Sequence, residues 1–339
     1  MRHSAVAILA VGLAAVLAGA RSFTAIGEWG ADAGQEVLGE FGVNGLARPD
    51  EPTIRRLFAR IDADVLDEAL GVYLWTRTGL VGSRRIIAID GKTVRGARTG
   101  DEHAPHVVAA LDHDAGAVLG QLAVAAQSNE IPCVRELLAT FDLAAAVVTL
   151  DAMHTQTDTA ETITDADGDY VLTIKNNTPT LRSKVKDLPW SDMSAHRHTE
   201  TGHGRRVTRT IKAVAAPRWI GFTGAAQVRR TVTEKNNKKK TVEVVYLITS
   251  ADHTAAPPPV LAAWVHGHWR IENRLHWVRD VTFDEDRSQA RTGNGPRVMA
   301  TLRSTAISVL RIDGWNNIAS GLRHHARHPD HVIGRGRSS

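Results

Sequence analysis

The sequence predicts an α/β fold, in which helices flank a mixed β-sheet and an all-helical module comes before the sheet. Two observations point to this class. Residues 1–80 show helical patterns without a strand-like run, whereas residues 84–174 combine short β-branched runs with amphipathic helices. A chain of 339 residues, 43% hydrophobic and 23% charged, is long and apolar enough to bury a sizeable core.

The predicted N-terminal module, residues 1–80, begins with an apolar run. Ala5–Ala20 is rich in alanine, the strongest helix former, and amphipathic helical patterns follow at 28–38 and 52–70. A secretory signal is the competing interpretation, because the run follows a basic start and ends in small residues. The run is short for a membrane span, which needs about twenty residues. The helices that follow favour a buried helix.

The sheet is predicted from short apolar runs between turn signals. Strands are expected at 84–90, 106–112, 117–124, 145–151 and 169–174, and helices at 130–141 and 152–166. The first three strands follow one another through short connections, which suits antiparallel pairing. The later strands are separated by helices, which requires parallel pairing with right-handed crossovers. A mixed sheet results.

Two of these strands end in a carboxylate, Asp90 and Asp151. Ligand sites in open α/β sheets lie beyond the carboxyl ends of the strands, so neighbouring parallel strands would present both side chains at one edge. For Asp90 alone, a turn is an equally good interpretation, because Gly91 follows it. A third carboxylate at the same edge would favour a metal site.

A basic segment follows the last of these strands. Residues 196–240 contain twelve Lys/Arg and two Glu, a net charge of +10, although the whole chain carries only +4. Strand-like runs at 205–214, 219–234 and 239–250 predict a β-rich insertion over 176–250. A polyanion, nucleic acid above all, is the expected partner. A solvated hairpin whose lysines protect an edge strand is the alternative. Cys133 is the sole cysteine, which excludes a disulfide framework and favours a reducing compartment.

A long helix is predicted around residues 264–282. Apolar residues at helical spacing form one stripe: Trp264, Ile271, Leu275 and Val278. Beside the stripe, one turn apart, stand His268, Glu272, His276 and Arg279. The two histidines and Glu272 could instead form a zinc-binding face. We interpret the acidic run 284–286 as a polar cluster at the helix end. A helix over 296–313 and a basic, flexible tail over 316–339 follow.

Six blocks carry a family resemblance: "IAIDGKTVRGA", "QSNEI", "VVTLDAMHTQ", "DYVLTIKNN", "HGRRVTR" and "HWRIENRLHWVRDVTFDED". In this order they closely resemble insertion-sequence transposases of the DDE superfamily, in the branch named for H-repeat-associated proteins (ISAs-type). The resemblance covers nearly the whole chain. It implies an RNase H-like catalytic domain over 81–315, interrupted by the basic insertion 176–250, behind a transposase-associated helical module.

The resemblance also implies a catalytic triad of Asp90, Asp151 and Glu272. These carboxylates would hold two Mg²⁺ ions, for which Mn²⁺ would substitute, because hard cations prefer oxygen ligands. Two such ions can stabilise both the attacking and the leaving oxygen of a phosphodiester. The implied activity is hydrolytic nicking of DNA at the element ends, followed by strand transfer to target DNA.

DNA is the implied partner, as terminal repeats and as target, with a homodimer on DNA, no membrane, and a cytoplasmic, nucleoid-associated location. Expected DNA contacts are Lys92, Lys175, His203, Arg205, Arg206, Lys238, Lys239, Lys240, His268, His276 and Arg279. The chain departs from the family pattern at its start, where relatives usually have a further basic stretch. The alternative function is therefore a truncated, catalytically inactive relic that still binds DNA.

Overall fold

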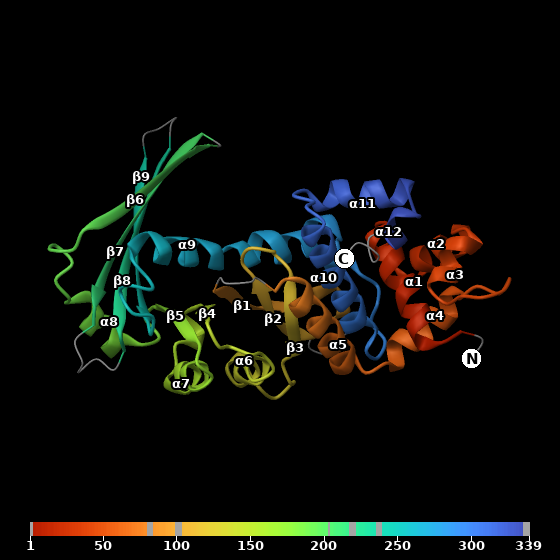
Figure 1. Cartoon of the computed structure of the whole chain (residues 1–339), viewed down its shortest axis with the longest axis horizontal. Helices are drawn as coiled ribbons and strands as arrows, with labels where there is room; N and C mark the ends of the chain where they lie inside the picture. The colour runs from red at the N-terminus through yellow and green to blue at the C-terminus, as the bar shows by residue number, and fades with distance from the viewer. Residues whose placement is uncertain are drawn as a thin grey trace. The chain divides into compact units, whose positions relative to one another are not determined.

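The computed structural model of the chain describes residues 3–79, 84–98, 104–202, 204–216, 222–234 and 239–334 (Figure 1). The chain divides into two compact units. Unit 1 contains Met1–Gly79, Gly91–Asn129 and Arg270–Ser339. Unit 2 contains Leu80–Asp90 and Glu130–Trp269. Each unit therefore combines segments that lie far apart in the sequence.

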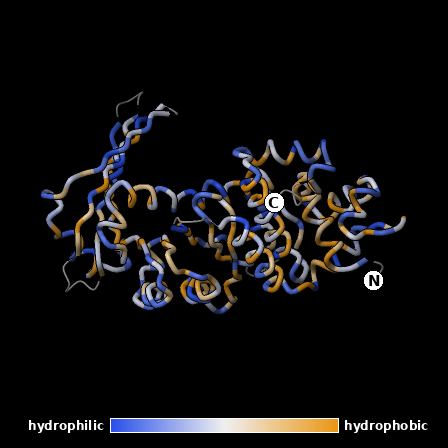
Figure 2. Tube along the Cα trace, viewed as in Figure 1, coloured by the Kyte–Doolittle hydropathy of each residue, from blue (hydrophilic) through white to orange (hydrophobic). Residues whose placement is uncertain are grey.

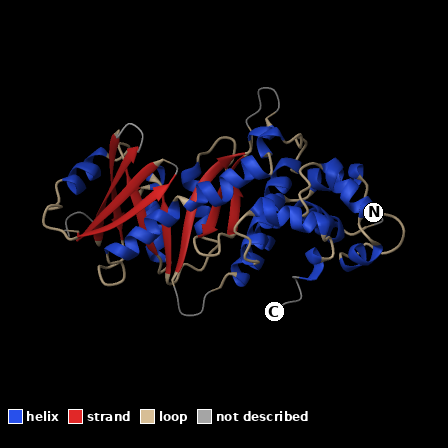
Figure 3. Ribbon diagram, turned by 90° about the horizontal axis from the view of Figure 1, so that it is seen from above, coloured by secondary structure: helices blue, strands red, loops and turns tan. Residues whose placement is uncertain are grey.

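Unit 1 begins with helices (Figure 3). They are α1 (Ala5–Leu17), α2 (Phe23–Asp32), α3 (Gln35–Glu40), α4 (Glu51–Arg60) and α5 (Ala63–Arg77). Side chains cap several of their first turns: Ser4, Ser22, Asp50 and Asp62 each accept a hydrogen bond from a backbone N–H two or three residues later. Helix α1 is buried along most of its length, with Ile8 and Val11 fully inaccessible. The prediction of a buried N-terminal helix is confirmed.

The rest of unit 1 packs around one long central helix. Its elements are the end of β1 (Arg85–Thr93), β2 (His106–Asp112), β3 (Val118–Ala123), α10 (Gly295–Ile312), α11 (Ile318–Arg327) and α12 (His331–Gly334). Helix α10 contacts α1, α4, α5 and α11, and most of its side chains are buried. Strands β2 and β3 pair antiparallel, as predicted. The segment from residue 316, predicted to be a flexible tail, instead forms α11, which buries Ile318 and Leu322. That prediction is wrong.

Unit 2 is built on a mixed sheet. Its strands are the first part of β1, β4 (Ala146–Leu150), β5 (Asp169–Ile174), β6 (Ala195–Gly202), β7 (Arg205–Ala215), β8 (Gly224–Glu234) and β9 (Lys240–Thr249). They are hydrogen-bonded in the order β1-β4-β5-β9-β8-β7-β6. The pairs β1–β4 and β4–β5 are parallel, and all pairs beyond β5 are antiparallel. The predicted mixed sheet is confirmed, and the basic insertion continues it through β9.

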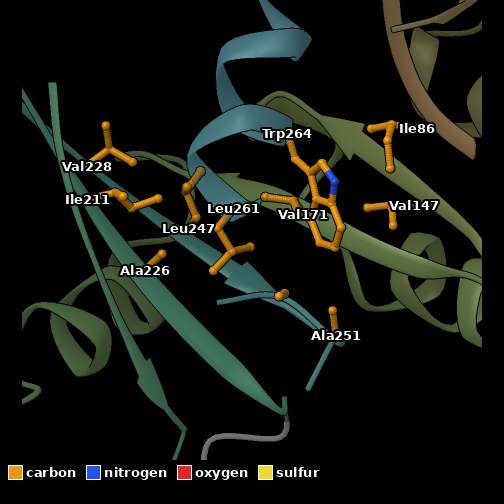
Figure 4. Packing of buried hydrophobic residues seen from close by; sticks show 11 residues of the cluster. Ile86, Val147, Val171, Ile211, Ala226, Val228, Leu247, Ala251, Leu261 and Trp264 are labelled. Atoms are coloured by element: carbon orange, nitrogen blue, oxygen red, sulfur yellow. The ribbon is translucent and has the colours of Figure 1, made fainter. Parts of the chain in front are cut away.

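Helices cover this sheet. They are α6 (Glu130–Leu138), α7 (Thr157–Asp165), α8 (Pro179–Lys186) and α9 (Pro258–His268). Figure 1 shows α9 and α7 on opposite sides of β4 and β5. From α9, Leu261 and Trp264 enter a core made by β1, β4, β5 and β7–β9 (Figure 4). Alternate residues of each strand reach this face, which explains why one helix touches many strands.

Sequence patterns missed α8 and β6 of unit 2 and placed the start of α7 too early. Strand β6 is almost entirely exposed, so it has no apolar alternation to reveal it, and Figure 2 shows that the outer ends of β6 and β7 are hydrophilic. The predicted helix 152–166 starts later, because a 3₁₀ turn, Ala152–His154, comes before α7. Within the described residues, every helix is too short or too polar to cross a membrane.

Candidate active site

Asp90 lies within β1, three residues before that strand ends, and Asp151 directly follows β4, the parallel neighbour of β1. The register of β1 and β4 pairs Ala88 with Thr149. Asp90 and Asp151 each follow two residues later, with Asp151 one residue beyond the end of β4, so extending the register sets these two positions side by side. Adjacent strands lie about 4.8 Å apart, and residues two apart share a face. The parallel pairing therefore leaves two half-buried aspartates at neighbouring positions of the sheet, and their joint role at one metal site stays a prediction.

The turn after β4 holds Asp151 in place. Its side chain accepts a hydrogen bond from the backbone N–H of Met153, 3.0 Å away, and so caps the 3₁₀ turn. The side chain of Asn177 donates to the carbonyl of Ala152 at 2.6 Å, which ties the same turn to the end of β5. Asp151 thus begins a braced turn rather than a loose loop.

A cavity of about 110 Å³ opens beside Asp151 in unit 2. Lys175, His268 and Trp269 contribute to its wall. His268 Nδ1 lies 3.1 Å from Thr149 Oγ1, and this hydroxyl also donates to the carbonyl of Ile87. Because a hydroxyl has a single proton, the imidazole is the donor to Thr149 through Nδ1–H. The cavity wall therefore combines the carboxylates of Asp151 and Glu243 with two groups that can bear positive charge, Lys175 and His268.

Glu272 belongs to unit 1, on the helical segment that continues the chain after α9. The segment consists of π-helical turns, Glu272–His276 and Val278–Thr282. Such turns are rare and are frequent at functional sites. The Glu272 side chain is 64% exposed, and one of its oxygens lies 3.6 Å from His276 Nδ1. Both residues are among the groups that could hold a metal ion. Burial lowers the pKa of His276, although Glu272 opposes this effect, so the imidazole stays neutral and available as a ligand.

Arg279, predicted to contact DNA, is instead fully buried. Its guanidinium lies 2.8 Å from Glu285, which also accepts from Arg303 of α10 at 3.0 Å. Burial raises the pKa of Glu285, but the charges of the two arginines outweigh burial and leave it below its ordinary value. The prediction that Arg279 contacts DNA is wrong. The acidic run 284–286 is also more than a surface cluster, because Glu285 forms a buried ion triad with Arg279 and Arg303.

The remaining predicted DNA contacts differ in accessibility. Lys92 is only 10% exposed and pairs with Asp280 at 2.6 Å, so it would have to leave this partner to bind a phosphate. Lys175 is exposed at the end of β5. Of the contacts predicted in the β-rich insertion, Arg205, Arg206, Lys239 and Lys240 are exposed. His203 and Lys238 lie outside the described residues.

A groove that the sequence did not reveal lies between α9 and the β-rich insertion of unit 2. It has a volume of about 220 Å³, and its wall includes Trp269, His266 and, from β6 and β7, His196, His198 and Arg209. The Arg209 guanidinium lies over the Trp269 ring, 6.0 Å from its centroid. Helical spacing could have indicated this groove. Trp269 is five residues after the buried Trp264, so its side chain lies on a different face of the helix, away from the core.

Comparisons with known proteins agree with this architecture. A family model described as a transposase DDE domain matches residues 82–309. This chain belongs to the DDE transposase family. A second model, described as DDE_Tnp_1-associated, matches residues 1–74 and so covers the helices at the start of this transposase.

Two relatives from Escherichia coli define the branch of the transposase. One, named "Putative transposase YncI" in strain O157:H7, is 32% identical over 328 residues, which are 92% of this chain and 83% of the relative. The other, named "H repeat-associated putative transposase YhhI" in strain K12, is 30% identical over 348 residues, 96% of this chain and 89% of the relative. The predicted H-repeat-associated branch is confirmed. A piggyBac transposase synaptic complex with hairpin DNA aligns with 11% identity and a TM-score of 0.46 over 98% of this chain and 72% of that chain.

Proposed function

We propose that this transposase catalyses metal-dependent cleavage of DNA at the ends of an insertion sequence and then transfers the freed strand to target DNA. The observation that carries the proposal is the parallel β1–β4 register, which, extended two residues beyond Ala88 and Thr149, sets position 90 beside position 151. An RNase H-like catalytic domain, with the basic β-rich insertion as an extension of its sheet, is the arrangement in which such a pair would work.

The residues of the proposed centre suit magnesium. Asp90, Asp151 and Glu272 offer carboxylate oxygens, the ligands that hard divalent cations prefer, and Mn²⁺ accepts the same set. When bound, two such ions would polarise the phosphodiester and lower the pKa of an attacking water. Glu272 is included because the family resemblance of its sequence block implies the third carboxylate at this position.

The neighbouring cations would bind the DNA strand. Lys175 and His268 line the cavity beside Asp151, where they would contact the phosphates on either side of the bond that is cut. His276 and Lys92 are placed less well, because both are buried and paired. The exposed arginines and lysines of the β-rich insertion would bind the backbone farther along the duplex, with no dependence on its sequence.

Both reaction steps are in-line displacements at phosphorus, so one centre can serve both without a protein nucleophile. In the first step water would release a 3′-OH at the element end, and in the second that hydroxyl would attack target DNA. Two element ends have to be held together, which favours a homodimer on DNA. A cytoplasmic, nucleoid-associated location follows from this substrate.

The test is Mg²⁺-dependent nicking of the cognate element end by the purified protein. Replacing Glu272 with Gln keeps the shape but removes the charge, so cleavage should fall by at least a hundredfold while DNA binding stays within about twofold. Glu68→Gln makes the same change at an exposed position of α5 and should cleave like the unchanged protein.

Each outcome separates the proposed function from the inactive relic. Cleavage lost in Glu272→Gln and kept in Glu68→Gln supports the enzyme. Near-normal cleavage in Glu272→Gln would place the third ligand elsewhere. DNA binding without any cleavage by the unchanged protein, in Mg²⁺ or in Mn²⁺, would identify the relic.

A further inference from the structure

The C-terminal helices of unit 1 gather histidines that the transposition chemistry does not use. His328, Asp330 and His331 are exposed, and each offers a ligand atom within 4.8 Å of the others. His324, from the last turn of α11, adds a fourth group, because its Nε2 lies 2.9 Å from Nδ1 of His331. Three imidazoles and a carboxylate therefore meet where α11 ends and α12 begins.

The ring geometry shows that these groups form one cluster rather than a scatter of surface residues. The rings of His328 and His331 are stacked, with centroids 5.0 Å apart and planes 19° apart. The His324 ring lies 4.9 Å from His328 and 5.1 Å from His331. His324 and His328 are four residues apart, the spacing that places two side chains on one helix face. The chain reverses at Pro329, which returns His331 to the same face.

We propose that this cluster is a transition-metal site that binds Zn²⁺ through His328, Asp330 and His331, with His324 as a fourth ligand. Neutral imidazole nitrogens with one carboxylate suit Zn²⁺ and are poor ligands for Mg²⁺. The exposed Arg323 and Arg327 nearby oppose a cation, and Asp330 offsets part of their charge. The site is separate in chemistry from the three carboxylates of the proposed catalytic centre.

Zinc at this point would connect α12 to the rest of unit 1. Val332, next to His331, contributes to the wall of an apolar groove of about 230 Å³ that α1, α5 and α10 also line. The groove includes Leu13, Leu70 and Val309. Fixing His331 to the end of α11 would hold Val332 over this groove, so metal binding would stabilise the packing of the C-terminal helix on the N-terminal helices.

The experiment measures Zn²⁺ bound to the full chain by equilibrium dialysis in excess Mg²⁺. The double variant His328→Ala/His331→Ala should lose one Zn²⁺ per chain, and Asp330→Asn should bind roughly tenfold more weakly. His253→Ala, at an exposed histidine of unit 2, is the matched control and should bind as much Zn²⁺ as the unchanged protein. Asp151→Asn should also keep the ion, because it alters the proposed catalytic centre only.

A second readout tests the structural consequence. Added Zn²⁺ should raise the melting temperature of the unchanged protein and of His253→Ala, and should leave that of the double variant unchanged. The proposal is overturned if the unchanged protein binds no Zn²⁺, if the double variant keeps the same stoichiometry, or if Asp151→Asn removes the ion. Because the altered side chains are exposed, Asp330→Asn gives the answer if the double variant does not fold.

Discussion

Asp67 provides a prediction whose size follows from the structure. This carboxylate of α5 is only 4% exposed, and it accepts hydrogen bonds from Gln121 at 2.8 Å and from Thr301 at 2.6 Å. Burial raises the pKa of Asp67 to about 6, despite these hydrogen bonds and the positive charge of Arg297. As pH rises, Asp67 in the unfolded chain, with an ordinary pKa of 3.8, therefore loses its proton at a lower pH than Asp67 in the folded protein.

The shift destabilises the fold at neutral pH. Stability is fully present below the unfolded pKa and falls as pH rises from about 4 to 6, because the folded state binds more protons in that window. A shift of about two units corresponds to about 3 kcal/mol. Asp67→Asn keeps an oxygen that accepts from Gln121 and Thr301 but has no charge to bury. We expect it to raise the free energy of unfolding by about 1–3 kcal/mol at pH 7.5 and by about zero at pH 4.

The assay is urea unfolding of both proteins at pH 4 and pH 7.5. Asp64→Asn is the control, because Asp64 pairs with the same Arg297 but is 56% exposed. Asp64→Asn should change the free energy of unfolding by no more than about 0.5 kcal/mol at both pH values. A change in Asp67→Asn that is equal at the two pH values, or a loss of stability at pH 7.5, would refute the account of a buried, proton-binding carboxylate.

The remaining predictions concern the buried triad and the insertion. Glu285→Gln leaves Arg279 and Arg303 buried without their anion, so it should lower the free energy of unfolding by about 3–5 kcal/mol in urea; a loss below about 1 kcal/mol would contradict the triad's role. Deleting 236–240 should weaken DNA binding and flatten its salt dependence, by about 0.9 in log–log slope for each phosphate that the protein no longer neutralises. Fluorescence anisotropy at several KCl concentrations measures that slope, and an unchanged slope would show that the segment does not touch the backbone.

The sequence revealed those parts of the fold that bury an apolar face. The strands that lead to Asp90 and Asp151 follow from β-branched runs, although β1 continues to Thr93 and β4 ends at Leu150. That the two strands are parallel neighbours was a condition of the predicted site, and the structure meets it. Trp264 and its helical repeat identified the helix that covers the sheet. In each case local pattern and long-range packing require the same residues, so the pattern predicts the structure.

The parts that the sequence did not reveal are held by polar contacts or lack a buried face. Strand β6 is hydrogen-bonded to β7 but has almost no buried side chain. Arg279 and Glu285 are charged residues, which are almost never fully buried unless paired. Their burial depends on Arg303, which follows Glu285 by eighteen residues in the sequence. For α11, Ile318, Leu322 and His325 do show helical spacing, but the histidines and arginines around them were interpreted as a flexible tail.

The buried triad explains how the end of the Glu272 helix is kept in place. Taking one carboxylate and two guanidinium groups out of water is costly, and apolar residues of similar size would often serve stability as well. The triad adds direction: Glu285 accepts from Arg279 at 3.0 Å and from Arg303 at 3.0 Å, one on each oxygen. Arg279 lies within the π-helical segment and Arg303 within α10. The paired charges therefore fix the rotation of the π-helical segment about its axis, because the two arginines can bind Glu285 well in only one orientation. The same rotation sets the direction in which Glu272 projects.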